Sequence, residues 1–179
     1  HLDRFRDGQA AIIRDVLSGH DTLAVMPTGS GKSLCYQLPG FMIPGLTLII
    51  SPLIALMKDQ IDSLLARGIP AAGLNALQTL AQQHDIIDAV VHERIKFLYV
   101  APERMKSSAF LSLMQRVKIG LLAVDEAHCI SQWGHDFRPD YRRIGALRQS
   151  LGNPTTIALT ATASTDVQRD IVEQLHFVD

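Results

Sequence analysis

A chain of 179 residues has the size of one globular domain and can bury a core of its own. Its 47% apolar and 20% charged residues are ordinary for a folded domain, and no apolar run approaches the roughly 20 residues of a membrane span. The net charge of −1 gives no overall attraction for nucleic acid, so such a site would have to be local. Two cysteines make no disulfide framework, which favours a reducing, cytosol-like compartment.

Short apolar runs typical of strands alternate along the chain with helical patterns of apolar residues. The strand-like runs span residues 22–26, 46–50, 71–74, 97–100, 119–124 and 155–159. The helical patterns span residues 34–38, 54–65, 77–91, 109–117, 142–151 and 165–175. Strands that alternate with helices predict an α/β fold, in which a mostly parallel sheet is flanked by helices on both faces.

Polar or helix-breaking residues follow most of these strand-like runs. Examples are Pro27-Thr28-Gly29 after the first run, Ser51-Pro52-Leu53 after the second and Asp125-Glu126 after the fifth. Ligands of open parallel sheets bind beyond the carboxyl ends of the strands, so we expect these segments to line one cleft. The chain starts within a pattern and stops just after a helix, which we interpret as a piece of something longer.

Residues 26–33, with the sequence MPTGSGKS, lie between a strand-like run and a helical pattern. This is the place of a phosphate-binding loop, in which backbone N–H groups and a helix N-terminus point at the anion. The strict motif has a glycine at the position of Met26. Lys32 is expected on the β- and γ-phosphates and Ser33 on Mg²⁺. The residues expected around the nucleotide phosphates are Thr28, Gly29, Ser30, Gly31, Lys32 and Ser33. The alternative is a glycine-rich turn that caps a helix.

Two adjacent carboxylates, Asp125 and Glu126, follow the apolar run 119–124. A phosphate loop and an acidic pair at a strand end are the minimum equipment for a nucleoside triphosphate and Mg²⁺. We expect Asp125 to hold Mg²⁺, directly or through water, and Glu126 to orient and deprotonate the attacking water. The alternative is a solvated acidic helix start that the helix dipole stabilises.

Histidine and cysteine side chains with a metal-like spacing follow the acidic pair, at His128, Cys129 and His135. Structural zinc takes four ligands, usually in paired short spacings, and the chain has no second pair. We therefore reject a zinc site. On chemistry alone, a histidine such as His128 in a first turn is often only a polar contact.

Several segments appear in the order of the motifs of superfamily 2 helicases, and together they resemble the first RecA-like lobe of that class. These segments are residues 5–9, 26–33, 51–53, 101–104, 125–128 and 158–163. Residues 128–141, HCISQWGHDFRPDY, closely resemble the aromatic-rich loop of the RecQ DNA helicases, which most other superfamily 2 helicases lack. The likeness extends over essentially the whole chain.

The resemblance implies a RecA-like P-loop domain spanning residues 1–179, the N-terminal lobe of an ATP-dependent motor that moves 3′ to 5′ and unwinds DNA. It also implies ATP and Mg²⁺ as cofactors, and single-stranded DNA, duplex junctions and a second RecA-like lobe as partners, without a membrane. We expect the protein in the cytoplasm with the bacterial nucleoid, or in a nucleus. A superfamily 2 motor acting on RNA and a non-catalytic nucleotide-binding module are the alternatives.

The resemblance assigns Gln9 and Arg6 to adenine recognition, and His128 to the catalytic Asp-Glu-Ala-His box. The Gln9 amide can pair with adenine N6 and N7, the two-point geometry used on DNA adenines. A polar helix start is the alternative for Gln9 and Arg6. Leu2 departs from the family, because an aromatic residue that stacks on the base often occupies this position in bacterial relatives.

The aromatic residues Trp133, Phe137 and Tyr141 recur at the spacing of a buried helical stripe. Pro139 interrupts such a helix, so a loop is favoured. Aromatic side chains beside Arg138 can stack on bases and pair with phosphates, at about 1–3 kcal/mol per base. Core packing is the alternative, and the family resemblance favours contact with DNA and relay to the ATP site.

The resemblance assigns Ser51, Lys58 and Arg104 to the sugar–phosphate backbone of DNA. It also places Thr160 and Thr162 where hydrolysis is coupled to strand separation. The alternatives are a helix cap for Ser51, solvated side chains for Lys58 and Arg104, and strand packing for the two threonines.

Overall fold

The computed structural model describes residues 4–177, so Leu2 lies outside the described residues. The strands are β1 (Thr22–Val25), β2 (Leu46–Ile50), β3 (Ala71–Leu74), β4 (Phe97–Val100), β5 (Ile119–Val124) and β6 (Thr156–Thr160). The helices are α1 (Gln9–Leu17), α2 (Lys32–Met42), α3 (Ile54–Ala66), α4 (Leu80–Val91), α5 (Ser108–Gln115), α6 (Ile144–Ser150) and α7 (Thr165–Gln174). Short 3₁₀ helices are η1 (Pro102–Lys106), η2 (Ala127–Ile130) and η3 (Pro139–Arg143).

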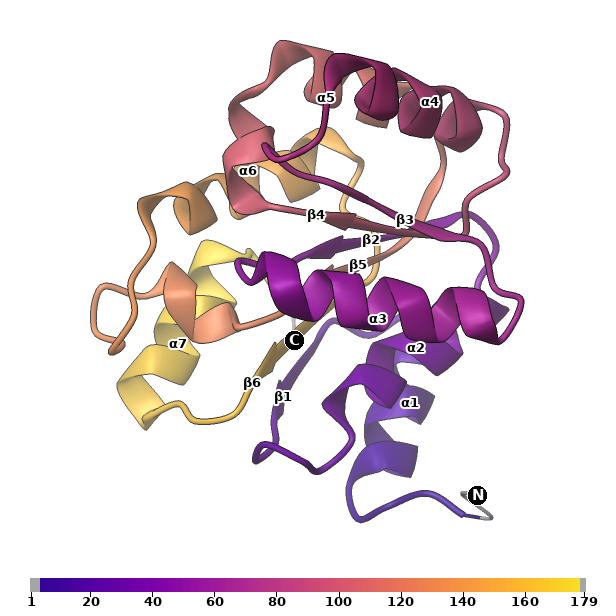
Figure 1. Cartoon of the computed structure of the whole chain (residues 1–179). Helices are drawn as coiled ribbons and strands as arrows, with labels where there is room; N and C mark the ends of the chain where they lie inside the picture. Colours follow the sequence, from indigo (N-terminus) through magenta and orange to yellow (C-terminus); the bar gives the residue numbers. More distant parts are fainter. Residues whose placement is uncertain (1–3, 178–179) are drawn as a thin grey trace.

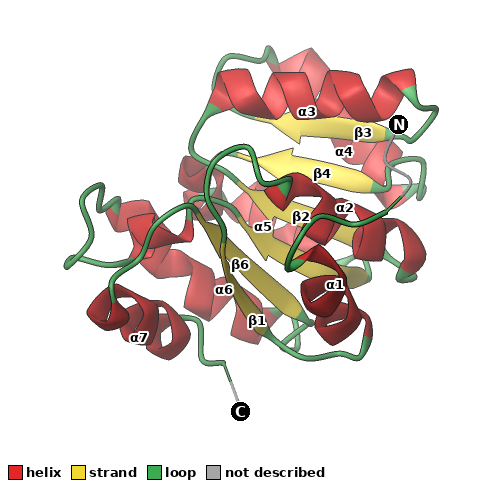
Figure 2. Ribbon diagram, turned by 90° about the horizontal axis from the view of Figure 1, so that it is seen from below, coloured by secondary structure: helices red, strands yellow, loops and turns green. Residues whose placement is uncertain are grey.

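The strands form one six-stranded sheet in the order β1-β6-β5-β2-β4-β3, and every pairing between neighbours is parallel. Figure 2 shows β3 at one edge of the sheet and β1 at the other. Because the strands are parallel, all of their carboxyl ends lie in one row, which crosses the sheet from β3 to β1. This row of strand ends is the carboxyl edge of the sheet. The segments that follow β1, β2, β4, β5 and β6 therefore begin along this edge, as the sequence predicts.

Two apolar cores, one on each face of the sheet, explain why the strands are apolar on both sides. Along β2, Leu48 and Ile50 belong to the core that α4 to α7 cover, whereas Ile49 belongs to the core under α1, α2 and α3. Strands buried on both faces are typical of parallel sheets whose crossover helices cover both sides. Figure 1 shows the helices arranged in these two layers. The predicted α/β class is confirmed.

The element boundaries follow the sequence prediction closely, with differences that have local causes. The helix α4 begins at Leu80 rather than at residue 77, because Thr79 and Gln82 form a reciprocal capping box. The helix α2 continues past Pro39, where a stop would be expected. Gly40, in its last turn, lies so close to β2 and β4 that an added Cβ would meet Thr47 and Phe97. Tertiary packing against the sheet therefore extends this helix.

The amphipathic helix α1 has no counterpart among the predicted helical patterns. It buries Gln9, Ile13 and Val16, and its N-cap Gly8 has a left-handed backbone, with φ of 84°. No helix between residues 4 and 177 has the length and apolarity needed to cross a membrane.

Candidate active site at the carboxyl edge of the sheet

The phosphate loop joins the end of β1 to the start of α2, as the sequence predicts. Gly29 and Gly31 both have left-handed backbones, with φ of 84° and 83°, a conformation that glycine adopts at little cost. Gly31 is the N-cap of α2, and no side chain caps this helix end. The first N–H groups of α2 are therefore available to an anion.

A pocket of about 420 Å³ lies over this loop. The predicted residues that line it are Arg6, Thr28, Gly29, Gly31, Lys32, Ser33, Asp125 and Glu126. The structure thus brings together the phosphate loop and the acidic pair, which are far apart in the sequence. Sequence reasoning missed Tyr36, Leu56 and Gln60, which also line the pocket. Tyr36 could have been found, because it lies one helical turn after Lys32 on the same face of α2.

Gln9 and Arg6 hold the phosphate loop from the side of α1. The Gln9 amide oxygen accepts from the Arg6 N–H at 2.7 Å, and its Nε2 donates to the Gly31 carbonyl at 3.0 Å. The Arg6 guanidinium donates to the Gly29 carbonyl at 2.5 Å. Gln9 is only 1% exposed, so in this conformation its amide supports the loop rather than facing the pocket. Adenine recognition by Gln9 stays a prediction.

Asp125 and Glu126 follow β5 and form a strained, charged corner of the pocket. Glu126 has φ of 52° and ψ of 45°, a left-handed conformation that is unusual for a residue with a side chain. Burial, together with the neighbouring Glu126 charge, raises the pKa of Asp125 to about 6. A nearby cation would relieve this repulsion and favour the ionised Asp125. The carboxylate oxygens of Asp125 and Glu126, with the nearby Ser33 hydroxyl, suit a divalent cation that also binds phosphate oxygens.

His128 connects the acidic box, residues 125–128, to the end of β6. Its Nδ1 lies 2.8 Å from the Thr160 hydroxyl, which itself donates to the Thr162 carbonyl at 3.1 Å. Because that hydroxyl proton is already used, the Thr160 oxygen accepts a hydrogen from Nδ1, and the neutral imidazole keeps its lone pair on Nε2. Burial lowers the pKa of His128, which favours this neutral form. The contact links two of the predicted motifs directly.

The sequence predicts that Trp133, Phe137 and Tyr141 do not share one continuous helix, and in the structure a loop separates the short 3₁₀ helices η2 and η3. Trp133 is 79% exposed, in a loop between η2 and η3. Phe137 is partly buried, and the Arg142 guanidinium lies 5.5 Å from its ring centre. Arg138 pairs with Asp136 at 3.4 Å, and its buried Nε has no partner within residues 4–177. Trp133 and Arg138 therefore keep side chains that are exposed to solvent.

Tyr141 differs from the expected base-stacking residue. It is fully buried in η3, and its hydroxyl donates to the Asp125 carbonyl at 2.8 Å. The prediction that this ring stacks on a base is therefore wrong for this conformation, because the ring is packed in the core of the domain. The bond to Asp125 instead suits the other role predicted for it, coupling to the ATP site.

The predicted backbone-gripping residues occupy different environments. Ser51 is 3% exposed, and α3 begins at Ile54 with Leu53 as N-cap. Ser51 is thus neither a helix cap nor open to a phosphate in this conformation, because its position at the end of β2 buries it. The Lys58 side chain is 75% exposed and pairs with Asp62 at 2.7 Å. The Arg104 Nε in η1 is buried without a partner among the described residues.

The two threonines predicted to couple hydrolysis with strand separation also differ. Thr160 is buried and bonded to His128, whereas Thr162 is exposed and contributes its carbonyl to the Thr160 hydroxyl. Of the two, Thr160 has the side chain that contacts the acidic box.

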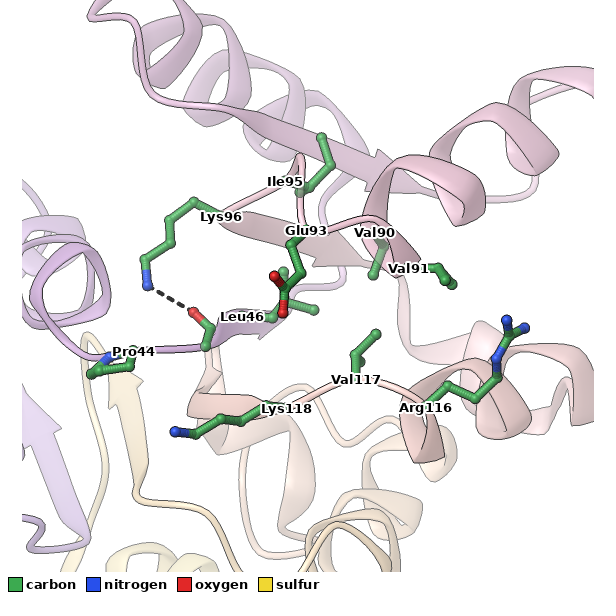
Figure 3. Close-up of a pocket in the computed structure, with 11 residues that line it drawn as sticks. Pro44, Leu46, Val90, Val91, Glu93, Ile95, Lys96, Arg116, Val117 and Lys118 are labelled. Atoms are coloured by element: carbon green, nitrogen blue, oxygen red, sulfur yellow. Dashed lines mark hydrogen bonds between the residues drawn. The ribbon is translucent and has the colours of Figure 1, made fainter.

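A second hollow, of about 400 Å³, lies where the strands β2, β4 and β5 begin, at the opposite ends of these strands from the phosphate loop. Figure 3 shows it between the segments that lead into β4 and β5, with Lys96, Lys118 and Glu93 on its walls. The Lys96 ammonium is engaged there, because it donates to the carbonyls of Ile43 and Gly45 at 2.5 and 2.7 Å. None of the predicted site residues lines this hollow. The predicted nucleotide-binding residues therefore gather at the pocket over the phosphate loop and not here.

Comparison with known proteins gives relatives that match nearly the whole chain. ATP-dependent DNA helicase RecQ of Haemophilus influenzae is 51% identical over 96% of this chain and 28% of its own length. The probable ATP-dependent DNA helicase RecS of Bacillus subtilis is 49% identical over 96% of this chain and 34% of its own. ATP-dependent DNA helicase Q5 of Rattus norvegicus is 45% identical over 94% of this chain and 18% of its own length. The chain thus spans about a third or less of these relatives.

Two solved structures have the same fold at low sequence identity. The Hef helicase domain of Pyrococcus furiosus superposes with a TM-score of 0.73 at 20% identity, over 96% of this chain and 37% of that one. The DUF1998 helicase MrfA, bound to DNA and AMPPNP, gives a TM-score of 0.73 at 23% identity, over 93% of this chain and 25% of that one. These neighbours support the RecA-like architecture.

The family model of the DEAD/DEAH box helicases matches residues 6–171, which include the phosphate loop, the acidic box and the segment after β6. The chain belongs to the DEAD/DEAH box helicase family.

Proposed function

We propose that this chain is the first RecA-like lobe of a RecQ-type DNA helicase, which binds ATP and single-stranded DNA. The observation that carries the proposal is one pocket that joins Lys32 and Ser33 to Asp125 and Glu126. The aromatic loop and the 45–51% identity to helicases named RecQ, RecS and Q5 support the RecQ type. The whole motor would move 3′ to 5′, in the cytoplasm with the nucleoid or in a nucleus.

The pocket residues divide the work of ATP hydrolysis among them. The Lys32 ammonium and the first N–H groups of α2 would bind the phosphates, and Ser33 and Asp125 would hold Mg²⁺. Bound Mg²⁺ would neutralise charge on the phosphate oxygens. Glu126 would accept the proton of the attacking water. The Glu126 carboxylate lies 3.6 Å from Nδ1 of His128, which bonds to Thr160, so His128 would relay the change in charge on Glu126 to Thr160.

DNA would lie along the carboxyl edge of the sheet, against Trp133, Arg138 and Arg104. The Arg138 side chain supports this placement, because it is 40% exposed and keeps its charge at the surface. A phosphate oxygen is a suitable acceptor for a guanidinium. The Trp133 ring would stack on DNA bases whatever their sequence.

A second RecA-like lobe would close the nucleotide site and supply an arginine finger. Such an arginine contributes roughly 10³–10⁵ in rate to related phosphoryl-transfer enzymes. The 179-residue chain alone should therefore bind nucleotide weakly, hydrolyse it barely and unwind nothing. Efficient unwinding by this lobe alone would contradict the proposal.

Binding of a fluorescent ATP analogue to the 179-residue chain, with Mg²⁺ present, tests the site. Lys32→Ala should abolish binding, whereas Glu126→Gln should preserve it and, in a chain that carries both lobes, stop turnover. Circular dichroism checks that both variants are folded. Normal binding by Lys32→Ala, or loss of binding in a folded Glu126→Gln variant, would refute the assigned roles.

A further inference from the structure

Three donors of different chemistry meet beside the acidic box. A ring nitrogen of His128, the Cys129 sulfur and an Asp136 carboxylate oxygen all lie within 4.8 Å of one another. The Cys129 Sγ is 3.8 Å from the Asp136 Oδ2. Tetrahedral zinc with bonds of about 2.0–2.3 Å places its ligand atoms about 3.3–3.8 Å apart. The sulfur–carboxylate pair has this spacing, whereas the cluster as a whole spans up to 4.8 Å and would have to close on the metal. We propose that His128, Cys129 and Asp136 bind a divalent cation of intermediate softness, for which Zn²⁺ is the fitting ion.

The hydrogen bond to Thr160 prepares His128 for this role. Because Nδ1 donates to the Thr160 hydroxyl, Nε2 keeps an unprotonated lone pair, and this is the nitrogen proposed to bind the metal. Metal-binding histidines usually donate their other ring N–H in this way, which fixes both tautomer and ring orientation. His135 is not needed as a ligand, since its ring stacks on that of His128, with 4.6 Å between centroids.

The donor set separates this site from the Mg²⁺ site at Ser33 and Asp125. Thiolate and imidazole ligands favour Zn²⁺, whereas Mg²⁺ takes oxygen ligands. Binding would break the Cys129 S–H bond, form a sulfur–zinc bond and release one proton to solvent. Three protein ligands leave a fourth position for water, so this is not a four-ligand structural site.

The site would tie the aromatic loop to the acidic box. His128 and Cys129 belong to η2, whereas Asp136 precedes Phe137 and now pairs with Arg138 at 3.4 Å. A metal held by all three would fix residues 136–138 against η2. Metal binding itself does not depend on the proposed function. Its consequence does: Zn²⁺ should inhibit DNA-stimulated ATP hydrolysis, because the relay through this loop would be immobilised.

Titration of the 179-residue chain with Co²⁺, in excess Mg²⁺, tests the site through a signal that only a thiolate ligand produces. The expected result is one Co²⁺ per chain, with a near-ultraviolet thiolate-to-cobalt charge-transfer band that Zn²⁺ abolishes. Cys129→Ala should lose the band, and Asp136→Asn should weaken binding at least about tenfold. Cys35→Ala is the matched control, because it removes the other cysteine and should keep the band.

Absence of the band in the folded wild-type chain would overturn the proposal, as would a band that survives Cys129→Ala. Misfolding does not explain weaker binding by Asp136→Asn, because the Asp136 side chain is 46% exposed and the change is isosteric. In a chain with both lobes, Zn²⁺ should slow DNA-stimulated hydrolysis by wild type but not by Asp136→Asn, each compared with its own zinc-free rate. Equal inhibition of both would refute the regulatory role. Failure of the helicase proposal would remove the DNA stimulation and leave the cobalt band.

Discussion

The Tyr141 hydroxyl donates a 2.8 Å hydrogen bond to the main-chain carbonyl of Asp125. The bond joins η3, at the end of the aromatic loop, to the residue expected to hold Mg²⁺. Because Tyr141 is fully buried, a displacement of η3 would be transmitted to the acidic box rather than absorbed by solvent. Under the proposed function, this contact would be a physical route from DNA bound on the loop to the ATP site.

Removal of this hydroxyl by Tyr141→Phe should uncouple the loop from the acidic box. The change leaves the Asp125 carbonyl without its donor, so we expect a loss of about 1–2 kcal/mol in the free energy of unfolding. In a chain with both lobes, DNA stimulation of ATP hydrolysis should fall more than the rate without DNA. Urea unfolding and steady-state hydrolysis measure the two effects.

Tyr99→Phe is the control for Tyr141→Phe. It also removes a buried hydroxyl, which bonds to Tyr36 at 2.7 Å and to Gln37 at 3.2 Å, but it leaves the Asp125 carbonyl bonded. Equal losses of DNA stimulation in both variants would show that lower stability, and not the bond to Asp125, is responsible.

Replacement by valine should destabilise the chain at Thr160 but not at Thr47, although both threonines are buried. Thr160→Val removes the acceptor of His128 and the donor to Thr162, and should cost about 1–3 kcal/mol. The Thr47 hydroxyl is buried without a partner among residues 4–177, so Thr47→Val should be neutral or stabilising. Equal losses in urea unfolding would contradict the hydrogen-bond assignment around His128.

Two glycines of the phosphate loop form a matched pair for testing the role of Gln9. Alanine at Gly29 or Gly31 meets the same left-handed backbone, which costs roughly 1–2 kcal/mol. An added Cβ has open space at Gly29, but at Gly31 it collides with the Gln9 amide. Gly31→Ala should therefore lose more stability than Gly29→Ala and, if Gln9 reads adenine, also lose its preference for ATP over GTP. Equal ATP preference in the two variants would argue against adenine recognition by Gln9.

The raised pKa of Asp125, about 6, should be measurable by carbon NMR of the nucleotide-free chain. Burial and the Glu126 charge raise it and Lys32 lowers it. Glu126→Gln should thus move the titration down, and Lys32→Ala should move it up. An Asp125 that titrates near the ordinary value of 3.8 would contradict the buried, charged corner.

The same shift predicts how stability depends on pH. For a carboxyl whose pKa is raised on folding, the stabilising contribution is complete below the unfolded value of 3.8 and is lost as pH rises through about 6. Asp125→Asn should therefore stabilise the nucleotide-free chain above about pH 6 and have little effect near pH 4. A stability difference that does not change with pH would contradict this.

The fold was largely predictable because its strands are continuous apolar runs between polar segments. The residue bounds expected for β2, β3, β4 and β5 are those of the structure. The helix α1 was missed, since its apolar residues follow the motif segment at residues 5–9 with no preceding strand to mark the helix. The extension of α2 past Pro39 depends on contacts with Thr47 and Phe97, which sequence spacing does not reveal.

The meeting of the phosphate loop and the acidic pair was also predictable, because parallel strands bring both to one edge. The burial of Ser51 and Tyr141 was not, because a motif shows which residues matter without showing which ones face solvent. The zinc site proposed at His128, Cys129 and Asp136 reverses the rejection of zinc that the sequence spacing led to. The spacing drew attention to His135, whereas the turn after η2 brings the Asp136 carboxylate to the sulfur.

Steady-state ATP hydrolysis by a chain that carries this lobe and a second RecA-like lobe tests the central claim most directly. The rate should be measured without nucleic acid, with single-stranded DNA and with single-stranded RNA. We predict strong stimulation by DNA alone, lost when Phe137 and Arg138 are both replaced by alanine in a variant that still binds nucleotide. Stimulation by RNA instead, or a rate indifferent to both, would contradict a RecQ-type DNA motor.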